Sequence, residues 1–63
     1  MTIQPAPADA ARLASFLRRY PCWSAFWDKH SGVWRVAEDD PGSVLYAESP
    51  GVDTVIRYIT AHP

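Results

Sequence analysis

The sequence predicts an α+β domain in which one helix, three antiparallel strands and a second helix follow in that order. Three observations lead to this fold class. Apolar residues recur at helical spacing near both ends of the chain, they alternate with polar residues in the middle, and turn-forming residues separate the alternating runs. Each helix has one apolar stripe and the sheet has one apolar face, so both helices should pack on that face.

The length of 63 residues allows a single domain. We place it at residues 8–63 and expect residues 1–7 to form a flexible N-terminal arm, because Pro5 and Pro7 disfavour helix in the residues before them. The first helix should begin near Ala8 or Asp9, since an acidic side chain suits a helix N-terminus. Its apolar stripe consists of Ala10, Leu13, Phe16, Leu17 and Tyr20.

A β-hairpin is expected in the middle of the chain, where a Gly-containing link joins two alternating runs. Pairing Trp27 with Trp34 keeps the large apolar groups on one face, whereas a slip of one residue would send half of them to water. The same register sets Phe26 opposite Arg35 on the other face, which predicts a cation–π pair. We interpret all three tryptophans, including Trp23, as core residues.

A tight turn and a third strand should follow the hairpin. Pro41 and Gly42 suit the two central positions of a type II turn, in which the second residue has a positive φ. This turn also explains the acidic run of residues 38–40. The strand predicted at residues 44–47 then brings Tyr46 opposite Ala37 on the face away from the tryptophans, with Glu48 opposite Arg35 on that face.

The second helix should begin at Ser49, a good N-cap, followed by Pro50 as the first helical residue. An apolar stripe at intervals of three and four supports it, made up of Val52, Val55, Ile56 and Ile59. We expect this helix to end near Ala61.

Composition narrows the class of protein. The net charge is −1, which argues against a general affinity for nucleic acid or anionic membranes. Cys22 is the single cysteine, so the chain has no internal disulfide and fits a reducing cytoplasm. The first residues do not resemble a signal peptide, and no apolar stretch is long enough for a membrane span. A thin core leaves self-association, such as a homodimer, as one means of stabilisation.

Residues capable of catalysis or metal binding are few and scattered. Asp28, His30, His62 and Cys22 lack the spacing of a metal site, so neither a metal nor another cofactor is expected. A nucleophilic cysteine needs a neighbouring base or cation, and we interpret Cys22 as a small apolar residue near the core. We therefore expect a protein that is not an enzyme.

One sheet face has no predicted cover and carries exposed aromatic residues. Our leading hypothesis is a small protein-interaction module, an adaptor or a regulator-associated or antitoxin-like protein, that binds through Phe26, Arg35, Tyr46 and Glu48. The alternative is a nucleic-acid-binding protein that uses three arginines outside the apolar stripe of the first helix, Arg12, Arg18 and Arg19. This alternative predicts binding that weakens steeply with salt.

The α-β-β-β-α order resembles the double-stranded-RNA-binding domain. That family has a lysine-rich start to its second helix, whereas this helix starts Ser49-Pro50-Gly51-Val52-Asp53, so RNA binding is not implied. The β-β-β-α part is similar to partial versions of the fold in small antitoxins. Trp-Arg-Val-Ala at 34–37 and Asp-Pro-Gly at 40–42 also look like short actinobacterial proteins, some of them encoded beside helix-turn-helix regulators, which implies a transcriptional regulator as partner.

Overall fold

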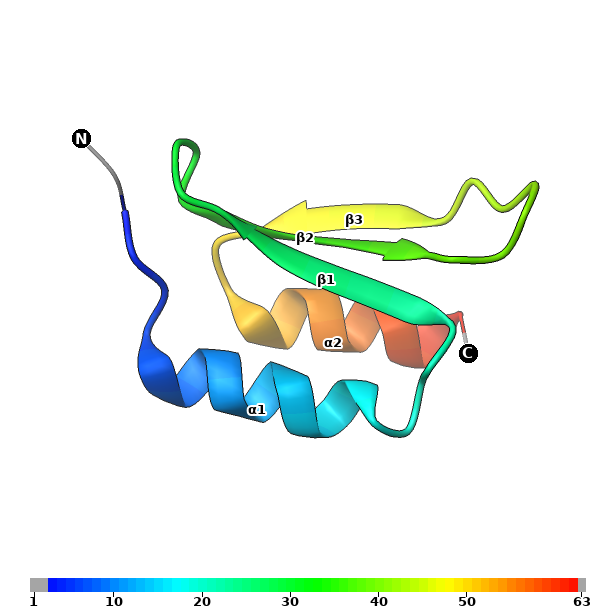
Figure 1. The fold of residues 1–63 in the computed structure, drawn as a ribbon, viewed down its shortest axis with the longest axis horizontal. Coiled ribbons are helices and arrows are strands. Elements are labelled where there is room, and N and C mark those ends of the chain that lie inside the picture. The colour runs from blue at the N-terminus through cyan, green and yellow to red at the C-terminus, as the bar shows by residue number, and fades with distance from the viewer. Residues whose placement is uncertain (1–2, 63) are drawn as a thin grey trace.

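The computed structural model describes residues 3–62. Its elements are α1 (Pro7–Leu17), β1 (Trp23–Asp28), β2 (Val33–Glu38), β3 (Tyr46–Ser49) and α2 (Val52–Ala61). The strands form one antiparallel sheet in the order β1-β2-β3. Both helices lie against the same face of this sheet (Figure 1). The predicted fold class is therefore confirmed, including the position of both helices.

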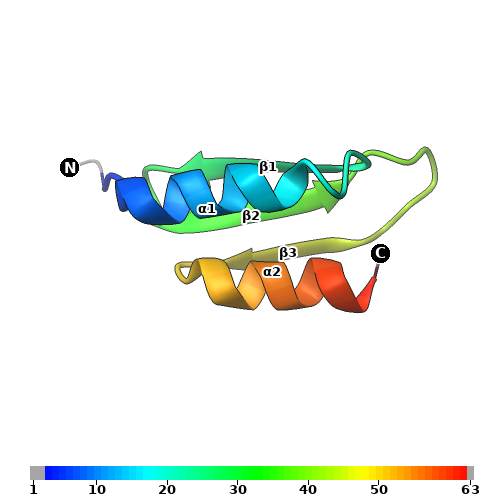
Figure 2. The same ribbon diagram turned by 90° about the horizontal axis from the view of Figure 1, so that it is seen from below.

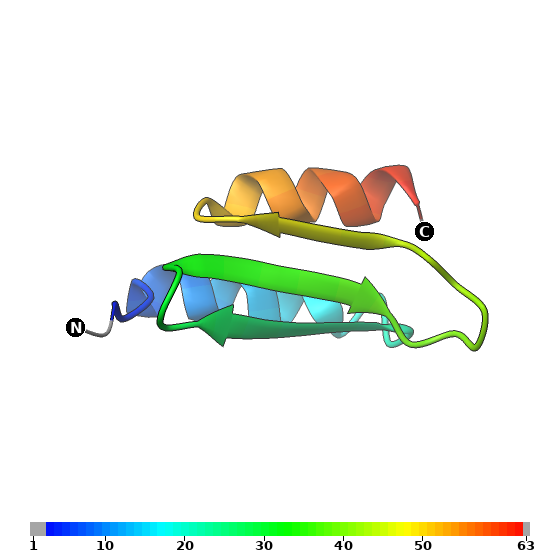
Figure 3. The same cartoon turned by 90° about the horizontal axis from the view of Figure 1, so that it is seen from above.

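The molecule has two layers. Seen from the helical side, α1 lies in front of β1 and β2, and α2 lies in front of β3 (Figure 2). Seen from the opposite side, the sheet forms the near surface, and no helix or loop of residues 3–62 crosses over it (Figure 3). One face of the sheet therefore packs against the helices and covers the core, and the other face is open.

The register of the first hairpin is the one that the tryptophans predict. Trp27 pairs with Trp34, and Phe26 pairs with Arg35. The rings of the two tryptophans meet edge to face, with centroids 5.1 Å apart. Gly32 in the connecting loop has a φ of 69°, a conformation that glycine adopts without steric cost.

The turn before β3 also agrees with the sequence. The N–H of Ser43 donates to the carbonyl of Asp40 at 2.9 Å, and Gly42 has a φ of 87°, as a type II turn requires. Strand β3 begins at Tyr46 and not at Val44, because the Leu45 N–H donates to the Ser43 hydroxyl rather than joining the ladder. The pairing of β3 with β2, Tyr46 with Ala37 and Glu48 with Arg35, is as predicted.

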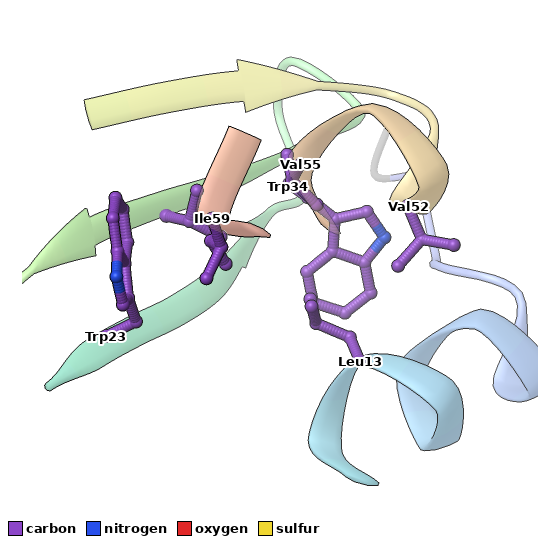
Figure 4. Close-up of a cluster of buried hydrophobic side chains, with 7 residues drawn as sticks. Leu13, Trp23, Trp34, Val52, Val55 and Ile59 are labelled. Atoms are coloured by element: carbon purple, nitrogen blue, oxygen red, sulfur yellow. The ribbon is translucent and has the colours of Figure 1, made fainter. Parts of the chain in front are cut away.

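A single apolar core lies between the two layers (Figure 4). Its buried members are Leu13, Trp23, Trp34, Val36, Val52, Val55 and Ile59. The other residues of the two predicted helical stripes pack against this cluster while partly buried. Trp23 and Trp34 are confirmed as core residues, and Trp27 is partly buried at its edge.

Helix α2 ends at Ala61, as predicted, whereas the start of each helix differs from the prediction. Helix α1 starts at Pro7 and stops at Leu17, after which Arg19 and Tyr20 donate to the carbonyls of Phe16 and Leu17 in a tighter turn. Helix α2 starts at Val52 with Gly51 as its N-cap. The Ser49 hydroxyl accepts the Gly51 N–H at 3.1 Å, so the expected serine oxygen is used in a turn that precedes the helix.

The segment before α1 is held in place at Ile3. Its N–H donates to the carbonyl of Lys29 at 2.9 Å, and its own carbonyl accepts the indole N–H of Trp27 at 2.6 Å. Residue 3 is therefore docked on the first hairpin, and the flexibility expected for residues 1–7 stays a prediction. Residues 1 and 2 of that expectation, and residue 63 of the predicted domain, lie outside the described part. Within the described range, neither helix has the length and apolar character needed to cross a membrane.

Candidate functional site on the outer sheet face

The open face of the sheet, called the outer face below, is set by the alternation of side chains along each strand. Because Trp23, Trp34 and Val36 point into the core, their neighbours in sequence point outward. The outer face consists of Ser24, Phe26 and Asp28 from β1, Val33, Arg35 and Ala37 from β2, and Tyr46 and Glu48 from β3. All four residues of the predicted protein-binding site belong to it.

Arg35 lies at the centre of this face and connects all three strands. Its Nε and Nη2 atoms donate to Asp28 Oδ2 on β1, at 3.0 and 2.7 Å. Its Nη1 atom donates to the Tyr46 hydroxyl and to Glu48 Oε2 on β3, both at 2.6 Å. The Tyr46 hydroxyl donates in turn to Glu48 Oε2 at 3.0 Å. Three side chains from two strands thus fix one guanidinium.

The predicted cation–π pair between Arg35 and Phe26 is not formed among the described residues. The two residues are cross-strand partners, as expected, but the guanidinium is drawn to oxygen atoms on either side. A charge-assisted hydrogen bond to a carboxylate is stronger than an exposed cation–π contact. Phe26 is therefore left without a polar partner on the outer face.

Electrostatics reinforce the network. The Arg35 guanidinium, followed by the backbone N–H groups of Ser31 and His30, lowers the pKa of Asp28 from 3.8 to about 2. Reciprocally, Asp28 and then Tyr46 raise the pKa of Arg35. Each group favours the charged form of the other. Asp28 and Arg35 are thus both ionised throughout the physiological pH range.

Two large aromatic side chains stand exposed on this face. Phe26 is 60% exposed and Tyr46 is 46% exposed. Tyr46 is held at two points, since its hydroxyl joins the Arg35 network and its backbone N–H donates to the Tyr58 hydroxyl of α2 at 3.3 Å. These hydrogen bonds fix the position of the Tyr46 side chain on the outer face.

The alternative nucleic-acid residues lie on the helical layer. Arg12 forms an ion pair with Asp53 of α2, which neutralises one of the three charges. Arg18 is the C-terminal cap of α1, and Arg19 follows in the turn beyond it. All three side chains are exposed, yet the helix ends before Arg18, so only Arg12 projects from α1 itself.

A cavity of about 320 Å³ opens where α1 leads into β1. It is lined by Arg19, Tyr20, Pro21, Cys22, Trp23 and Glu38. Cys22 is exposed, and its expected position near the core is wrong. Its carbonyl accepts the Asp39 N–H at 2.6 Å, which extends the hairpin, and alternation then points its side chain away from the face that buries Trp23.

Sequence reasoning missed two members of the site. Asp28 is absent from the predicted binding residues, although its position two residues beyond Phe26 sets it diagonally across from Arg35. Asp39, just past β2, accepts a hydrogen bond from the Ser24 hydroxyl. At the rim of the outer face it adds a third carboxylate to those of Asp28 and Glu48. Among residues 3–62, no group of three or more His, Cys, Asp or Glu side chains could hold a metal ion.

Comparisons with protein-family models, with curated proteins and with solved structures found no match for this chain. The function is therefore inferred from the geometry of the described residues.

Proposed function

We propose that this protein is a small, non-catalytic protein-interaction module, an adaptor or a regulator-associated protein, that binds its partner through the outer face. One observation carries the proposal: Phe26 and Tyr46 are exposed on a sheet face that no part of residues 3–62 covers. Aromatic residues and arginine are enriched at the centres of protein interfaces.

The order of the face supports this role. Binding costs free energy whenever side chains must be immobilised. Here Arg35, Tyr46 and Glu48 already hold one another through hydrogen bonds of 2.6 to 3.0 Å. The entropic cost of fixing these side chains arises during folding. It therefore does not reduce the free energy of binding to a partner.

The test is partner capture with the double variant Phe26→Ala, Tyr46→Ala. The tagged wild-type protein and the variant are compared in a pull-down with mass spectrometry, with and without nuclease. A matched control is Val44→Ala, which removes an apolar side chain that is 91% exposed but lies in the loop before β3. Circular dichroism and thermal melting show that each variant remains folded.

We expect one protein to be captured by the wild type and by Val44→Ala, and to be lost with the double variant, in both nuclease conditions. Capture that survives in the double variant contradicts this placement of the site. Capture that disappears with nuclease instead favours the nucleic-acid alternative, in which Arg12, Arg18 and Arg19 are the residues to replace.

A further inference from the structure

We infer that the outer face binds a basic segment of its partner, with one arginine or lysine side chain seated between Phe26 and Tyr46. This inference rests on the proposed function and specifies the chemistry of the partner.

Charge is the first argument. Every nitrogen of the Arg35 guanidinium already donates to Asp28, Tyr46 or Glu48. The outer face and its rim hold three carboxylates, Asp28, Asp39 and Glu48, against this one guanidinium, which leaves a formal charge of −2. The strands thus offer a partner surplus negative charge on this face, and Lys29 lies beyond β1 in the hairpin loop.

This acidity is local to one layer of the molecule. The helices and the turn after α1 carry Arg12, Arg18, Arg19 and Arg57 against Asp9 and Asp53, a formal charge of +2. The chain as a whole has a net charge of only −1. The sheet is therefore the acidic side, and complementarity directs a cationic partner to it.

The spacing of the aromatic residues is the second argument. Phe26 lies on β1 and Tyr46 on β3, which are the two edge strands of the sheet. These strands are about 10 Å apart, because neighbouring strands are spaced by about 4.8 Å. Between them on β2 lie the small side chain of Ala37, which pairs with Tyr46, and Arg35, which pairs with Phe26. A partner side chain above Ala37 would have Tyr46 on one side and Phe26 diagonally across on the other.

A cation in that position has favourable partners on every side. Its charge would lie beside the exposed aromatic side chains of Phe26 and Tyr46, with which cation–π contacts form at distances up to about 6 Å. Glu48, half exposed with its Oε2 atom bonded to Arg35 and Tyr46, and Asp39 at the rim supply opposite charge. The site combines aromatic surface with excess carboxylate, which is the chemistry that recognises arginine and lysine.

The negative charge of the outer face disfavours binding of a second outer face or of nucleic acid. Two outer faces packed together would bring like charges into contact, and nucleic-acid phosphates would be repelled. The positive helical layer of a second copy remains a cationic surface, and self-association through it is one outcome of the test.

The test is a titration of the ¹⁵N-labelled protein, followed by NMR, with a short arginine–serine peptide. The same peptide with glutamine or glutamate in place of arginine provides the comparison. Glu48→Gln and Asp39→Asn each remove one charge from the site. Asp40→Asn removes one charge from the adjacent turn and is the matched control.

We expect the arginine peptide to shift the amides of Phe26, Ala37, Tyr46 and Glu48, and to lose affinity with salt. The double variant Phe26→Ala, Tyr46→Ala should weaken binding about tenfold, Glu48→Gln and Asp39→Asn should each weaken it, and Asp40→Asn should not. Equal binding of the glutamine peptide, a preference for the glutamate peptide, or shifts confined to the helices would overturn the inference.

Two results distinguish a failure of this inference from a failure of the proposed function. If the captured partner needs Phe26 and Tyr46 but is insensitive to Glu48→Gln and to salt, the interaction module stands and the basic segment is wrong. If no captured partner needs the aromatic pair, both fail. Sedimentation velocity provides a third measurement, in which salt-sensitive self-association lost in Glu48→Gln would reassign the site to a second copy of the chain.

Discussion

Arg35 and Asp28 join the two strands of the first hairpin on the outer face. Two nitrogens of the guanidinium, Nε and Nη2, donate to one carboxylate oxygen of Asp28, at 3.0 and 2.7 Å. The other oxygen accepts the backbone N–H groups of His30 and Ser31, at 2.9 and 3.2 Å. Asp28 therefore connects the loop that closes the hairpin with the network that orders Tyr46.

The stability of the domain should fall in acid because of this carboxylate. The pKa of Asp28 is about 2 in the folded protein, against an ordinary value of 3.8. A depressed folded pKa contributes stability above the unfolded pKa, and that contribution disappears as the pH falls from about 4 to about 2. We expect Asp28→Asn to have lower stability at neutral pH and a flatter dependence in this range.

The measurement is urea unfolding followed by tryptophan fluorescence at several pH values from neutral to acid. Asp40→Asn, which removes a carboxylate from the turn, should retain the acid dependence of the wild type. An Asp28→Asn protein whose stability falls as steeply as that of the wild type would show that other carboxylates govern the acid transition.

The sequence predicts the sheet well because alternation and size act together. A one-residue slip would expose Trp34 or Trp27, so the register follows from burial alone. The outer-face position of Phe26 and Tyr46 follows from the same alternation. These features depend on period and side-chain volume, which a single chain displays.

The parts that the sequence does not predict depend on contacts between distant residues. Arg35 contacts Asp28 and not the ring of Phe26, because its guanidinium forms hydrogen bonds to Asp28 across the two strands. The docking of Ile3 beside Trp27 is a contact over 24 residues with no periodic signal. Cys22 is exposed because it pairs with Asp39, which extends the hairpin by one residue before Trp23 and turns the Cys22 side chain away from the core.

The core should tolerate little loss of volume. Ile59 is completely buried, and truncation of such a residue to alanine costs about 2–5 kcal/mol. At roughly 0.05–0.15 kcal/mol per residue, a domain of this size has only about 3–9 kcal/mol of stability. We expect Ile59→Ala to lower the free energy of unfolding by about 2–5 kcal/mol, as measured by urea unfolding. Val44→Ala, at an exposed position, should change the stability by less than about 0.5 kcal/mol, and a loss equally small in Ile59→Ala would contradict the assigned core.

The two core tryptophans should differ in their response to phenylalanine. Within the described structure, the indole N–H of Trp23 is buried with no hydrogen-bond partner, and a donor stranded in this way costs about 1–3 kcal/mol. Trp23→Phe removes that cost together with some packing, whereas Trp34→Phe loses packing alone. We expect Trp23→Phe to be the less destabilising change by about 1 kcal/mol in urea unfolding. The reverse order would indicate that the Trp23 N–H is satisfied in solution.

Gly32 and Gly42 provide a direct test of whether Ile3 is docked. Both have a positive φ, so alanine at either position carries a backbone cost of about 1–2 kcal/mol. A Cβ at Gly42 would meet nothing within 4 Å, whereas one at Gly32 would lie 2.9 Å from Ile3 Cδ1. Gly32→Ala should therefore be slightly the more destabilising of the two, because the exposed end of the Ile3 side chain must turn aside.

A double-mutant cycle separates the two costs at Gly32. In an Ile3→Ala background the steric conflict is absent, so Gly32→Ala should cost about as much as Gly42→Ala. Thermal melts of the three single variants, Ile3→Ala with Gly32→Ala, and Ile3→Ala with Gly42→Ala complete the comparison. If Ile3→Ala leaves the cost of Gly32→Ala unchanged, the Ile3 side chain does not restrict a Cβ at residue 32.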